Sequence, residues 1–209
     1  MEQNQNENRE KLIACAKQEF LEKGFAKASL RKISGDAGLT TGAVYFFFHD
    51  KEGLFGAIVD EPLSRIMQVL QTHFAEDAEE DLRSYQHQNG DHDAFAEQLI
   101  TAMYADYDAL MILLHHAGGS RYEGITERMI GMLDAYYEQL AARYAALFTG
   151  KRVNHYMLHW FSHVQINAFV HLLEHEPDSE KALEKIKPVM DCLIEGWVKY
   201  ILEDDRPAG

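Results

Sequence analysis

Histidine is the residue type whose number and spacing first suggest chemistry in this 209-residue chain, which contains eleven of them. His155, His159 and His163 follow one another at four-residue intervals, a spacing at which two imidazoles on one helix can chelate a metal ion. Each such step drifts about 40° around the helix, so His171 and His175 lie on another side of it from His155. No His-Glu-x-x-His motif and no neighbouring cysteine accompanies them. We therefore predict structural or interface histidines and no metal or other cofactor, with a His-based metal-binding protein or metalloenzyme as the alternative.

A second chemically suggestive group is the run of small residues Thr40, Thr41, Gly42 and Ala43, which precedes a short apolar stretch. Small residues at the start of a helix let its N-terminus approach the edges of bases in the major groove of DNA. A helix N-terminus also carries partial positive charge and free N–H groups that bind phosphate. The run therefore predicts a recognition helix for double-stranded DNA.

Such a recognition helix must be positioned by neighbouring helices and tight turns. Gly24 is predicted to end a first amphipathic helix, Ser29 to cap a second, Gly38 to end that one, and Asp50 to cap a fourth. The predicted helices are Arg9–Lys23, Leu30–Ala37, Gly42–Phe48, and a fourth that begins at Lys51. Within them, Val44 and Phe48 are predicted to be core residues, and the helix-turn-helix motif covers about residues 29–48.

The rest of the chain also shows helical periodicity. Pro62 is predicted to kink or restart the fourth helix near Asp60 or Glu61, because proline lacks an N–H and disfavours helical geometry before it. Residues 76–93 are polar and are predicted to form a connection. The remaining predicted helices are Leu63–Phe74, Ala94–His116, Gly124–Phe148, Val153–Glu174 and Ser179–Leu202. The sequence thus predicts an all-α fold, with a DNA-binding domain at 1–50, a larger helical domain at 51–209, and the fourth helix connecting the two.

Charge is segregated along the chain. The net charge is −14, yet residues 1–51 contain eight Lys or Arg against seven Asp or Glu, so the acidic excess lies beyond residue 51. An acidic surface repels phosphate, whereas the nearly neutral N-terminal segment tolerates it. This segregation indicates two units with different partners.

Several classes of protein are disfavoured by what the sequence lacks. It has no run of about 18 apolar residues and does not open with a basic and then apolar leader, so we expect no membrane partner and a cytoplasmic location. Cys15 and Cys192 are too few and too far apart for a disulfide framework or a four-cysteine zinc site, and both are predicted to be core residues.

Two segments resemble the DNA-binding headpiece of the TetR family of transcriptional regulators: residues 12–25, LIACAKQEFLEKGF, and residues 30–54, LRKISGDAGLTTGAVYFFFHDKEGL. The residues at the family spacing are Ala37-Gly38-Leu39-Thr40, Gly42, Val44, Tyr45, Phe48, Lys51, Glu52 and Leu54. This pattern is far more restrictive than a generic helix-turn-helix. The resemblance implies a repressor without enzymatic activity, which binds a palindromic operator as a homodimer and is released by a small-molecule effector.

The resemblance also implies roles for individual residues. Tyr45 and Lys51 would contact phosphate. Independently of the resemblance, the consecutive Phe46, Phe47 and Phe48 cannot all be buried on one short helix, so Phe46 either faces thymine methyls or sugar edges or belongs to the core. The predicted DNA-binding residues are Ser29, Arg31, Thr40, Thr41, Gly42, Tyr45, Phe46 and Lys51. Three departures from the family pattern, at Ala28, Gly35 and Phe47, each remove a contact or weaken a helix. They leave open a dimeric ligand-binding protein that no longer binds DNA.

The family likeness further implies an effector pocket and a dimer interface in the larger domain. Methionine and tyrosine side chains suit an apolar effector, and large exposed aromatic residues favour a second copy of the chain. The predicted effector-pocket residues are Tyr104, Tyr107, Met111, Met129, Met132, Tyr136 and His163. The predicted dimer-interface residues, expected to be exposed in a single chain, are Trp160, Phe161, Leu172, Trp197 and Tyr200.

Overall fold

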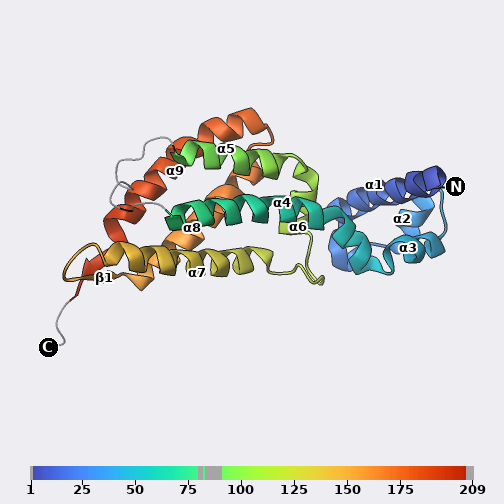
Figure 1. Ribbon diagram of the computed structural model, residues 1–209. Helices are drawn as coiled ribbons and strands as arrows, with labels where there is room; N and C mark the ends of the chain where they lie inside the picture. Colours follow the sequence, from blue (N-terminus) through green and yellow to red (C-terminus); the bar gives the residue numbers. More distant parts are fainter. Residues whose placement is uncertain (1, 80–81, 83–90, 206–209) are drawn as a thin grey trace. The chain divides into compact units, whose positions relative to one another are not determined.

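The computed structural model describes residues 2–79, 82 and 91–205, and this part of the chain consists almost entirely of α-helices (Figure 1). The helices are α1 (Glu2–Lys27), α2 (Leu30–Asp36), α3 (Thr41–Phe48), α4 (Lys51–Glu79), α5 (Asp91–Tyr104), α6 (Tyr107–His115), α7 (Ile125–Ala145), α8 (His155–His175) and α9 (Ser179–Tyr200). The predicted all-α fold class is confirmed. A short antiparallel pair of strands, β1 (Lys151–Val153) and β2 (Leu202–Asp204), was not predicted, because three residues are too few to show a strand periodicity.

The chain forms two compact units. Unit 1 runs as far as Ile66 and also takes in Ala105–Ile125, whereas unit 2 contains Met67–Tyr104 and the residues from Thr126 onward. The division therefore falls within α4, further along the chain than the predicted domain boundary at residue 50. Unit 1 includes a segment distant in sequence because α6 packs against α1.

An apolar stripe on α1 forms the centre of unit 1. Leu12, Ala16 and Phe20 stand four residues apart, on one helical face, and all are fully buried. The ring of Phe20 meets that of Phe55 in α4 edge-on, with 5.0 Å between the ring centroids. This contact joins the first helix to the start of the fourth.

The predicted bounds differ from the observed ones at several helix ends, most clearly in the first and fourth helices. The first helix begins at Glu2 rather than Arg9, because its first turns are exposed and have no apolar face to reveal them. The fourth helix continues through Pro62 without a restart. Ile58 and Val59, in the turn before the proline, are buried, so core packing offsets the backbone hydrogen bond that proline cannot make.

The predicted single helix Ala94–His116 is in fact two helices, α5 and α6. The break falls at Asp106, whose backbone is non-helical (φ −142°, ψ 66°). Its carboxylate accepts hydrogen bonds from Lys17 Nζ in α1 at 2.8 and 3.0 Å. At the other end of α6, the carbonyl of His116 accepts a hydrogen bond of 2.7 Å from the backbone N–H of Phe25. Contacts with α1, rather than local sequence, therefore define this helix.

Unit 2 is a helical bundle in which α9 packs against both α5 and α8. Its buried core cluster consists of Leu82, Leu140, Ala141, Tyr144, Leu158, Phe161, Trp197 and Ile201. The strand pair lies beside this cluster, with Val153 opposite Leu202, and both of these residues pack against it. The predicted connection 76–93 is shorter than expected, since α4 extends to Glu79 and α5 begins at Asp91; residues 80, 81 and 83–90 lie outside the described part.

None of the described helices is long and apolar enough to cross a bilayer. The two cysteines, predicted to be core residues, differ in burial: Cys15 is half-buried and Cys192 is exposed. The prediction for Cys192 is therefore wrong, because it lies on the outward face of the amphipathic helix α9.

Glu19 is a buried carboxylate that ties α1 to the start of α2. The residue is 2% exposed, its Oε1 accepts a hydrogen bond from the backbone N–H of Ser29 at 3.1 Å, and its Oε2 lies 3.0 Å from Lys32 Nζ. Burial disfavours the charged form, but the bonds from Lys32 and Ser29 outweigh burial, so the pKa of Glu19 falls below its ordinary value. The ionised carboxylate therefore stabilises unit 1.

This lowered pKa predicts an acid-sensitive headpiece. The stabilisation is fully present above the unfolded pKa of about 4.3 and is lost as the pH falls through the lower folded value. We expect the hydrogen-exchange protection of α2 amides to decrease below about pH 4.3. Glu19→Gln should reduce this protection by about 1–3 kcal/mol at pH 7 and flatten its pH dependence. Glu22→Gln, at an exposed glutamate of the same helix, is the control, and an equally steep dependence in Glu19→Gln would contradict the assignment.

Candidate nucleic-acid interface

Helices α2 and α3 form a helix-turn-helix, as predicted for residues 29–48. The turn between them contains Gly38 with a φ of 69°, a left-handed conformation that glycine adopts without strain. The backbone N–H of Leu39 donates to the carbonyl oxygen of Ser34 at 2.8 Å and closes the turn. Helices α2 and α3 pack directly against each other. The second helix of the motif is thus held in a fixed orientation within unit 1.

The two faces of α3 differ sharply in exposure. Val44 and Phe48 are buried, which confirms that they are core residues. On the other face, Gly42 is exposed, and the side chains of Tyr45 and Phe46 are 55% and 68% exposed. Tyr45 and Phe46 are neighbours in sequence, and contiguous exposed apolar surface often marks an interaction site. The outward face of α3 therefore offers an apolar and hydroxyl-bearing surface to a partner.

The two threonines before this face have different surroundings. Thr40 occupies the N-cap position of α3, but its side chain makes no capping hydrogen bond, and the residue is exposed. Thr41 is half-buried, and its hydroxyl lies 3.2 Å from the hydroxyl of Ser34 in α2. The hydroxyl of Thr41 thus joins the two helices, while Thr40 is presented to solvent.

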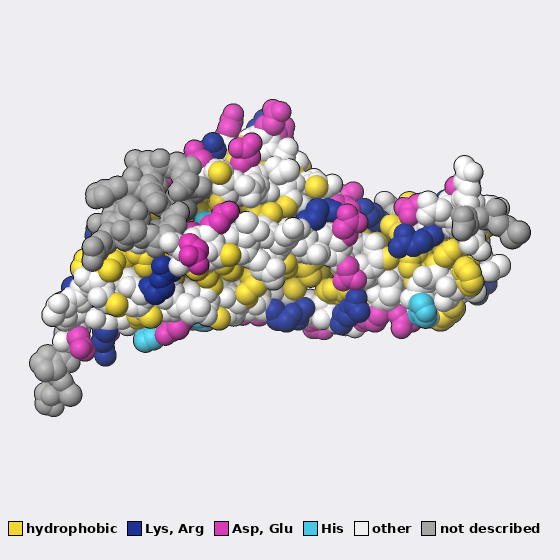
Figure 2. Space-filling model, in the orientation of Figure 1, with side chains coloured by type: hydrophobic (Ala, Val, Ile, Leu, Met, Phe, Trp, Pro, Cys, Tyr) yellow, Lys and Arg dark blue, Asp and Glu magenta, His cyan; other side chains and the backbone are white. Residues whose placement is uncertain are grey.

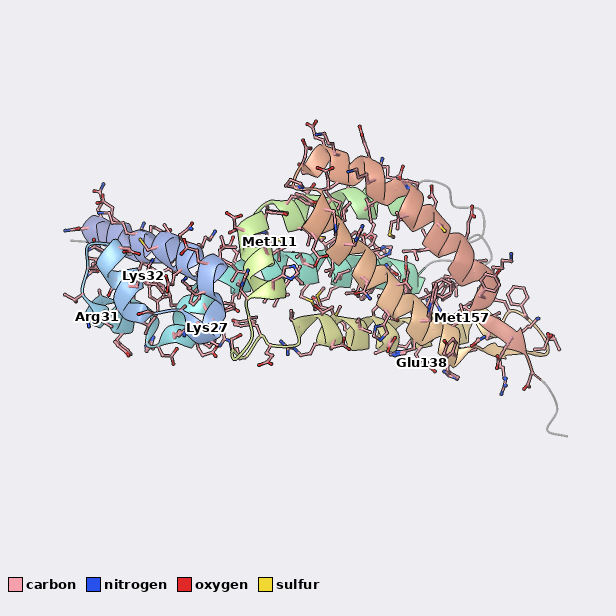
Figure 3. All side chains as sticks on the ribbon, turned by 180° about the vertical axis from the view of Figure 1, so that it is seen from behind. Lys27, Arg31, Lys32, Met111, Glu138 and Met157 are labelled. Carbon is pink, nitrogen blue, oxygen red and sulfur yellow. The ribbon has the colours of Figure 1, made fainter. Side chains whose placement is uncertain are left out.

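Basic side chains accompany α2. Ser29 caps this helix, as predicted, by accepting a hydrogen bond from the backbone N–H of Lys32 at 3.3 Å. Lys27 and Arg31 are exposed, and within the described residues neither has an ion-pair partner, whereas Lys32 is paired with Glu19 and Asp36 (Figure 3). The prediction omitted Lys27. Its position two residues before the cap of α2 is the signal that could have identified it.

Lys51, which is predicted to contact phosphate, makes contacts within unit 1. Its Nζ donates to the carbonyl oxygen of Ala26 at 3.2 Å and lies 4.8 Å from the centroid of the Phe25 ring. Burial lowers the pKa of Lys51, although Glu19 and Glu52 act in the opposite direction. Lys51 therefore connects the start of α4 to the end of α1.

The residues predicted to line one effector pocket are distributed over both units. Tyr107 and Met111 belong to α6 of unit 1, and both are half-buried. Met111 is labelled in Figure 3. In unit 2, the hydroxyl of Tyr104 donates to the carbonyl oxygen of Glu176 at 2.5 Å. Met129 and Met132 are half-buried in α7, and His163 is half-buried in α8. Of the predicted set, Tyr136 lines the cavity of unit 2.

This cavity of unit 2 has a volume of about 30 Å³. Its lining residues are His73, Phe74, Asp77, Tyr136, Tyr137, Phe161, Gln165, Met190, Leu193, Ile194 and Trp197. Asp77 is buried and accepts a hydrogen bond from the hydroxyl of Tyr136, whose ring stacks on that of Phe74 at a centroid distance of 3.8 Å. The Tyr137 hydroxyl donates to Gln165, and burial raises the pKa of Tyr137. The cavity is thus mainly aromatic, with one carboxylate on its wall.

Three of the predicted dimer-interface residues are not exposed. Phe161, Leu172 and Trp197 are buried within the chain itself, so the expectation that they need a second copy for solvation is wrong. Phe161 and Trp197 belong to the core cluster of unit 2, where helices of the same chain cover them. Trp160 and Tyr200, in contrast, are 44% and 49% exposed.

Comparison with known proteins shows that the headpiece is similar in sequence to a known family. A family model described as "Bacterial regulatory proteins, tetR family" matches residues 12–58. The HTH-type transcriptional repressor BepR of Brucella suis biovar 1 (strain 1330) is 43% identical over 53 residues, which are 25% of this chain and 25% of BepR. The chain thus spans about a quarter of the length of this curated relative.

Solved structures extend the likeness beyond the headpiece. A transcriptional regulator (TerR/AcrR family) from Aquifex aeolicus VF5 superposes with a TM-score of 0.55 and 18% identity, over 89% of this chain and 99% of that one. The fatty acid degradation regulator FadR from Bacillus halodurans gives a TM-score of 0.53 and 14% identity, over 90% and 98% of the two chains. At these identities the comparison shows a shared fold. The headpiece, residues 12–58, is thus similar in sequence to the tetR family of bacterial regulatory proteins, and the fold of the chain is similar to the folds of these two solved structures.

Proposed function

We propose that this chain is a transcriptional repressor that binds a duplex operator through α3. The observation that carries the proposal is the division of α3 into a buried face, with Val44 and Phe48, and an exposed face, with Gly42, Tyr45 and Phe46. The major groove of B-DNA is about 12 Å wide and admits an α-helix presented in this way. The likeness to BepR, which is a repressor, supports repression rather than activation.

Each exposed residue suits a particular contact with DNA. Thr40 and Gly42 are small enough to let the start of α3 approach base edges, and Phe46 suits the methyl group of thymine. The Tyr45 hydroxyl suits a phosphate oxygen.

Acidic and basic side chains are interspersed on the face seen in Figure 2. Because the chain as a whole is acidic, attraction to phosphate must come from local groups such as Lys27 and Arg31.

The contact by Tyr45 gives a direct test of this proposal. Tyr45→Ala should weaken binding to a duplex taken from immediately upstream of the chain's own coding sequence by about tenfold to a hundredfold, the range expected for a hydrogen bond to a charged oxygen. Tyr156→Ala is the matched control, since Tyr156 is also an exposed helical tyrosine but lies in unit 2. Fluorescence anisotropy measures both variants. Equal affinities of the Tyr45→Ala variant and the wild type would contradict the proposed role of α3.

We further propose that the repressor acts as a two-fold homodimer on a palindromic operator. Trp160 in α8 and Tyr200 at the end of α9 leave apolar surface exposed, which association with a second copy would bury. A two-fold dimer would bring its two recognition helices to half-sites about 34–36 Å apart. A monomer in sedimentation equilibrium at micromolar concentration, both alone and with operator DNA, would contradict this arrangement.

We also propose that a small aromatic or amphipathic effector opens the cavity of unit 2 and thereby releases DNA. A volume of about 30 Å³ holds a water molecule, whereas small-molecule sites commonly reach about 300–1,000 Å³, so the effector must displace side chains. His73, Phe74 and Asp77 belong to α4, which continues without a break into unit 1. Displacement of these side chains would thus act on the helix that follows the headpiece.

The effector hypothesis has its own test. Met190→Trp would fill the cavity, so an effector that enters there should lose its ability to release DNA from this variant. Trp197 lines the same cavity, and its fluorescence should change when the effector binds to the wild-type chain. Unchanged release of DNA by the effector from the Met190→Trp variant would place the effector site elsewhere.

A further inference from the structure

Two imidazoles on α8, those of His159 and His163, meet in a T-shaped arrangement in unit 2. Their Nε2 atoms lie 3.1 Å apart, and the ring planes are inclined at 82° with 4.5 Å between centroids. The side chain of His159 is 61% exposed, so ions in solution can reach the pair. The four-residue spacing of these histidines in the sequence therefore brings their two Nε2 atoms close together.

The carboxylate of Asp134 in α7 determines which nitrogen of His159 carries the proton. Its Oδ2 lies 2.7 Å from His159 Nδ1. An ionised carboxylate only accepts hydrogen bonds, so Nδ1 must be the donor and Nε2 of neutral His159 keeps its lone pair. A carboxylate behind a metal-binding imidazole orients the ring and raises its basicity in just this way. The pair thus has one ligand that is already in the correct tautomer.

We propose that His159 and His163 bind a divalent transition-metal ion such as Zn²⁺, with Asp134 as a positioning residue. Two nitrogen ligands at the usual zinc–nitrogen distance of about 2.0–2.1 Å in a tetrahedral site lie about 3.3 Å apart, close to the separation observed. Binding requires only that the proton of His163 move from Nε2 to Nδ1, so no net proton is released from a neutral pair. The remaining coordination positions face solvent and are filled by water.

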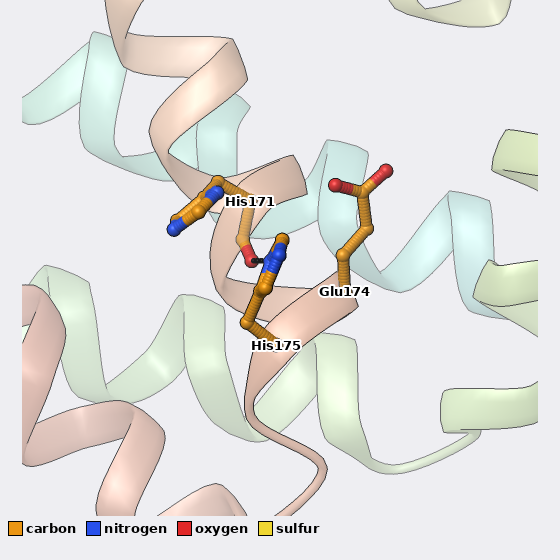
Figure 4. A group of neighbouring side chains, drawn as sticks. All are labelled: His171, Glu174 and His175. Atoms are coloured by element: carbon orange, nitrogen blue, oxygen red, sulfur yellow. Dashed lines mark hydrogen bonds between the residues drawn. The ribbon is translucent and has the colours of Figure 1, made fainter.

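A second histidine group on the same helix is less suited to a metal ion. One nitrogen or oxygen atom from each of His171, Glu174 and His175 lies within 4.8 Å of the others, and all three residues are exposed (Figure 4). However, the two imidazoles stack nearly parallel, at 28° and a centroid distance of 4.1 Å, so their in-plane lone pairs do not converge. His175 Nδ1 is also engaged by the backbone carbonyl of His171 at 2.8 Å. This group serves as the internal control.

The test is calorimetric titration of Zn²⁺ into the full chain prepared without a histidine tag. We expect one saturable equivalent per chain, which is lost in His159→Ala and in His163→Ala. Asp134→Asn should retain the equivalent but weaken binding by about tenfold to a hundredfold, the usual effect of removing a carboxylate behind a ligand. The His171→Ala/His175→Ala double variant should bind as the wild type does. Because His159 is exposed and His163 is half-buried, circular dichroism should show all variants folded.

The outcomes that overturn the proposal are equally specific. Absence of a saturable equivalent in the wild type would exclude the site. Retention of that equivalent in folded His163→Ala, or its loss in the His171→Ala/His175→Ala variant, would place the metal elsewhere. Asp134→Asn distinguishes positioning from simple proximity, since an unchanged affinity would show that the carboxylate does not orient His159. None of these outcomes depends on whether the chain binds DNA.

Discussion

Replacing Gly53 with alanine is expected to lower the free energy of unfolding of unit 1 by about 1–3 kcal/mol or more, the cost of forcing extra atoms into a packed site. A β-carbon at this position would lie 1.9 Å from the carbonyl oxygen of Phe48 and 3.0 Å from its carbonyl carbon. These are backbone atoms, so no side-chain rotation relieves the clash. The end of α3 and the start of α4 would have to separate, and binding to DNA should weaken with them.

The matched control is Gly42→Ala, the same substitution on the exposed face of α3. A β-carbon there would meet the Thr40 hydroxyl oxygen at 3.5 Å, an ordinary van der Waals contact. Gly42→Ala should therefore stabilise the chain by about 0.4–1 kcal/mol, because alanine loses less conformational entropy on folding. It should nevertheless weaken binding to DNA if α3 approaches base edges closely.

The two glycine variants are thus predicted to change stability in opposite directions. Thermal unfolding followed by far-ultraviolet circular dichroism measures both. Fluorescence would be less informative, because Trp160 and Trp197 both lie in unit 2. A Gly53→Ala variant as stable as the wild type would contradict the close approach of the two helices, and destabilisation by Gly42→Ala would contradict the open surroundings of that residue.

The headpiece could be predicted from the sequence because its determinants are local. Ser29 caps the helix that directly follows it, and Asp50 accepts a hydrogen bond of 2.7 Å from the backbone N–H of Gly53, three residues away. Gly24, whose non-helical backbone interrupts α1, and Gly38, which follows α2, both have positive φ angles, and the apolar helical pattern of the sequence stops at both positions. The break at Asp106 is different, since its contact is with Lys17, 89 residues earlier in the chain. Such a pairing leaves no mark in a local pattern.

The burial of side chains in unit 2 was also harder to predict, because it depends on contacts between residues that are distant in sequence. The periodicity of α8 and α9 identifies an apolar face but does not say whether the same chain or a second copy covers it. Phe161 and Trp197 turned out to be covered from within. The contacts of Lys51 with Ala26 and Phe25 also depend on the path of the backbone after Gly24. The residue types of the candidate interface were therefore readable from the sequence, whereas their partners required the fold.

Neutralising Lys27 and Arg31 together is expected to weaken binding to operator DNA by about thirtyfold at 0.15 M salt. Each phosphate contact contributes about 0.9 to the slope of log affinity against log salt concentration, so two lost contacts reduce the slope by about 1.8. The substitutions Lys27→Gln and Arg31→Gln keep the side chains long and polar. Both residues are exposed and have no ion-pair partner within the described part of the chain, so folding should not change.

The control for this double variant must remove the same charge elsewhere. Lys181→Gln/Lys199→Gln does so in unit 2, at two exposed residues of α9. If Lys27 and Arg31 contact phosphate, the salt slope falls in the headpiece variant alone. If only net charge matters, both double variants lose affinity equally, and the local role is excluded. Phosphate contacts cannot form without releasing counterions. A wild-type chain with no salt-dependent affinity for any duplex would therefore favour the alternative, a ligand-binding protein whose headpiece no longer binds DNA.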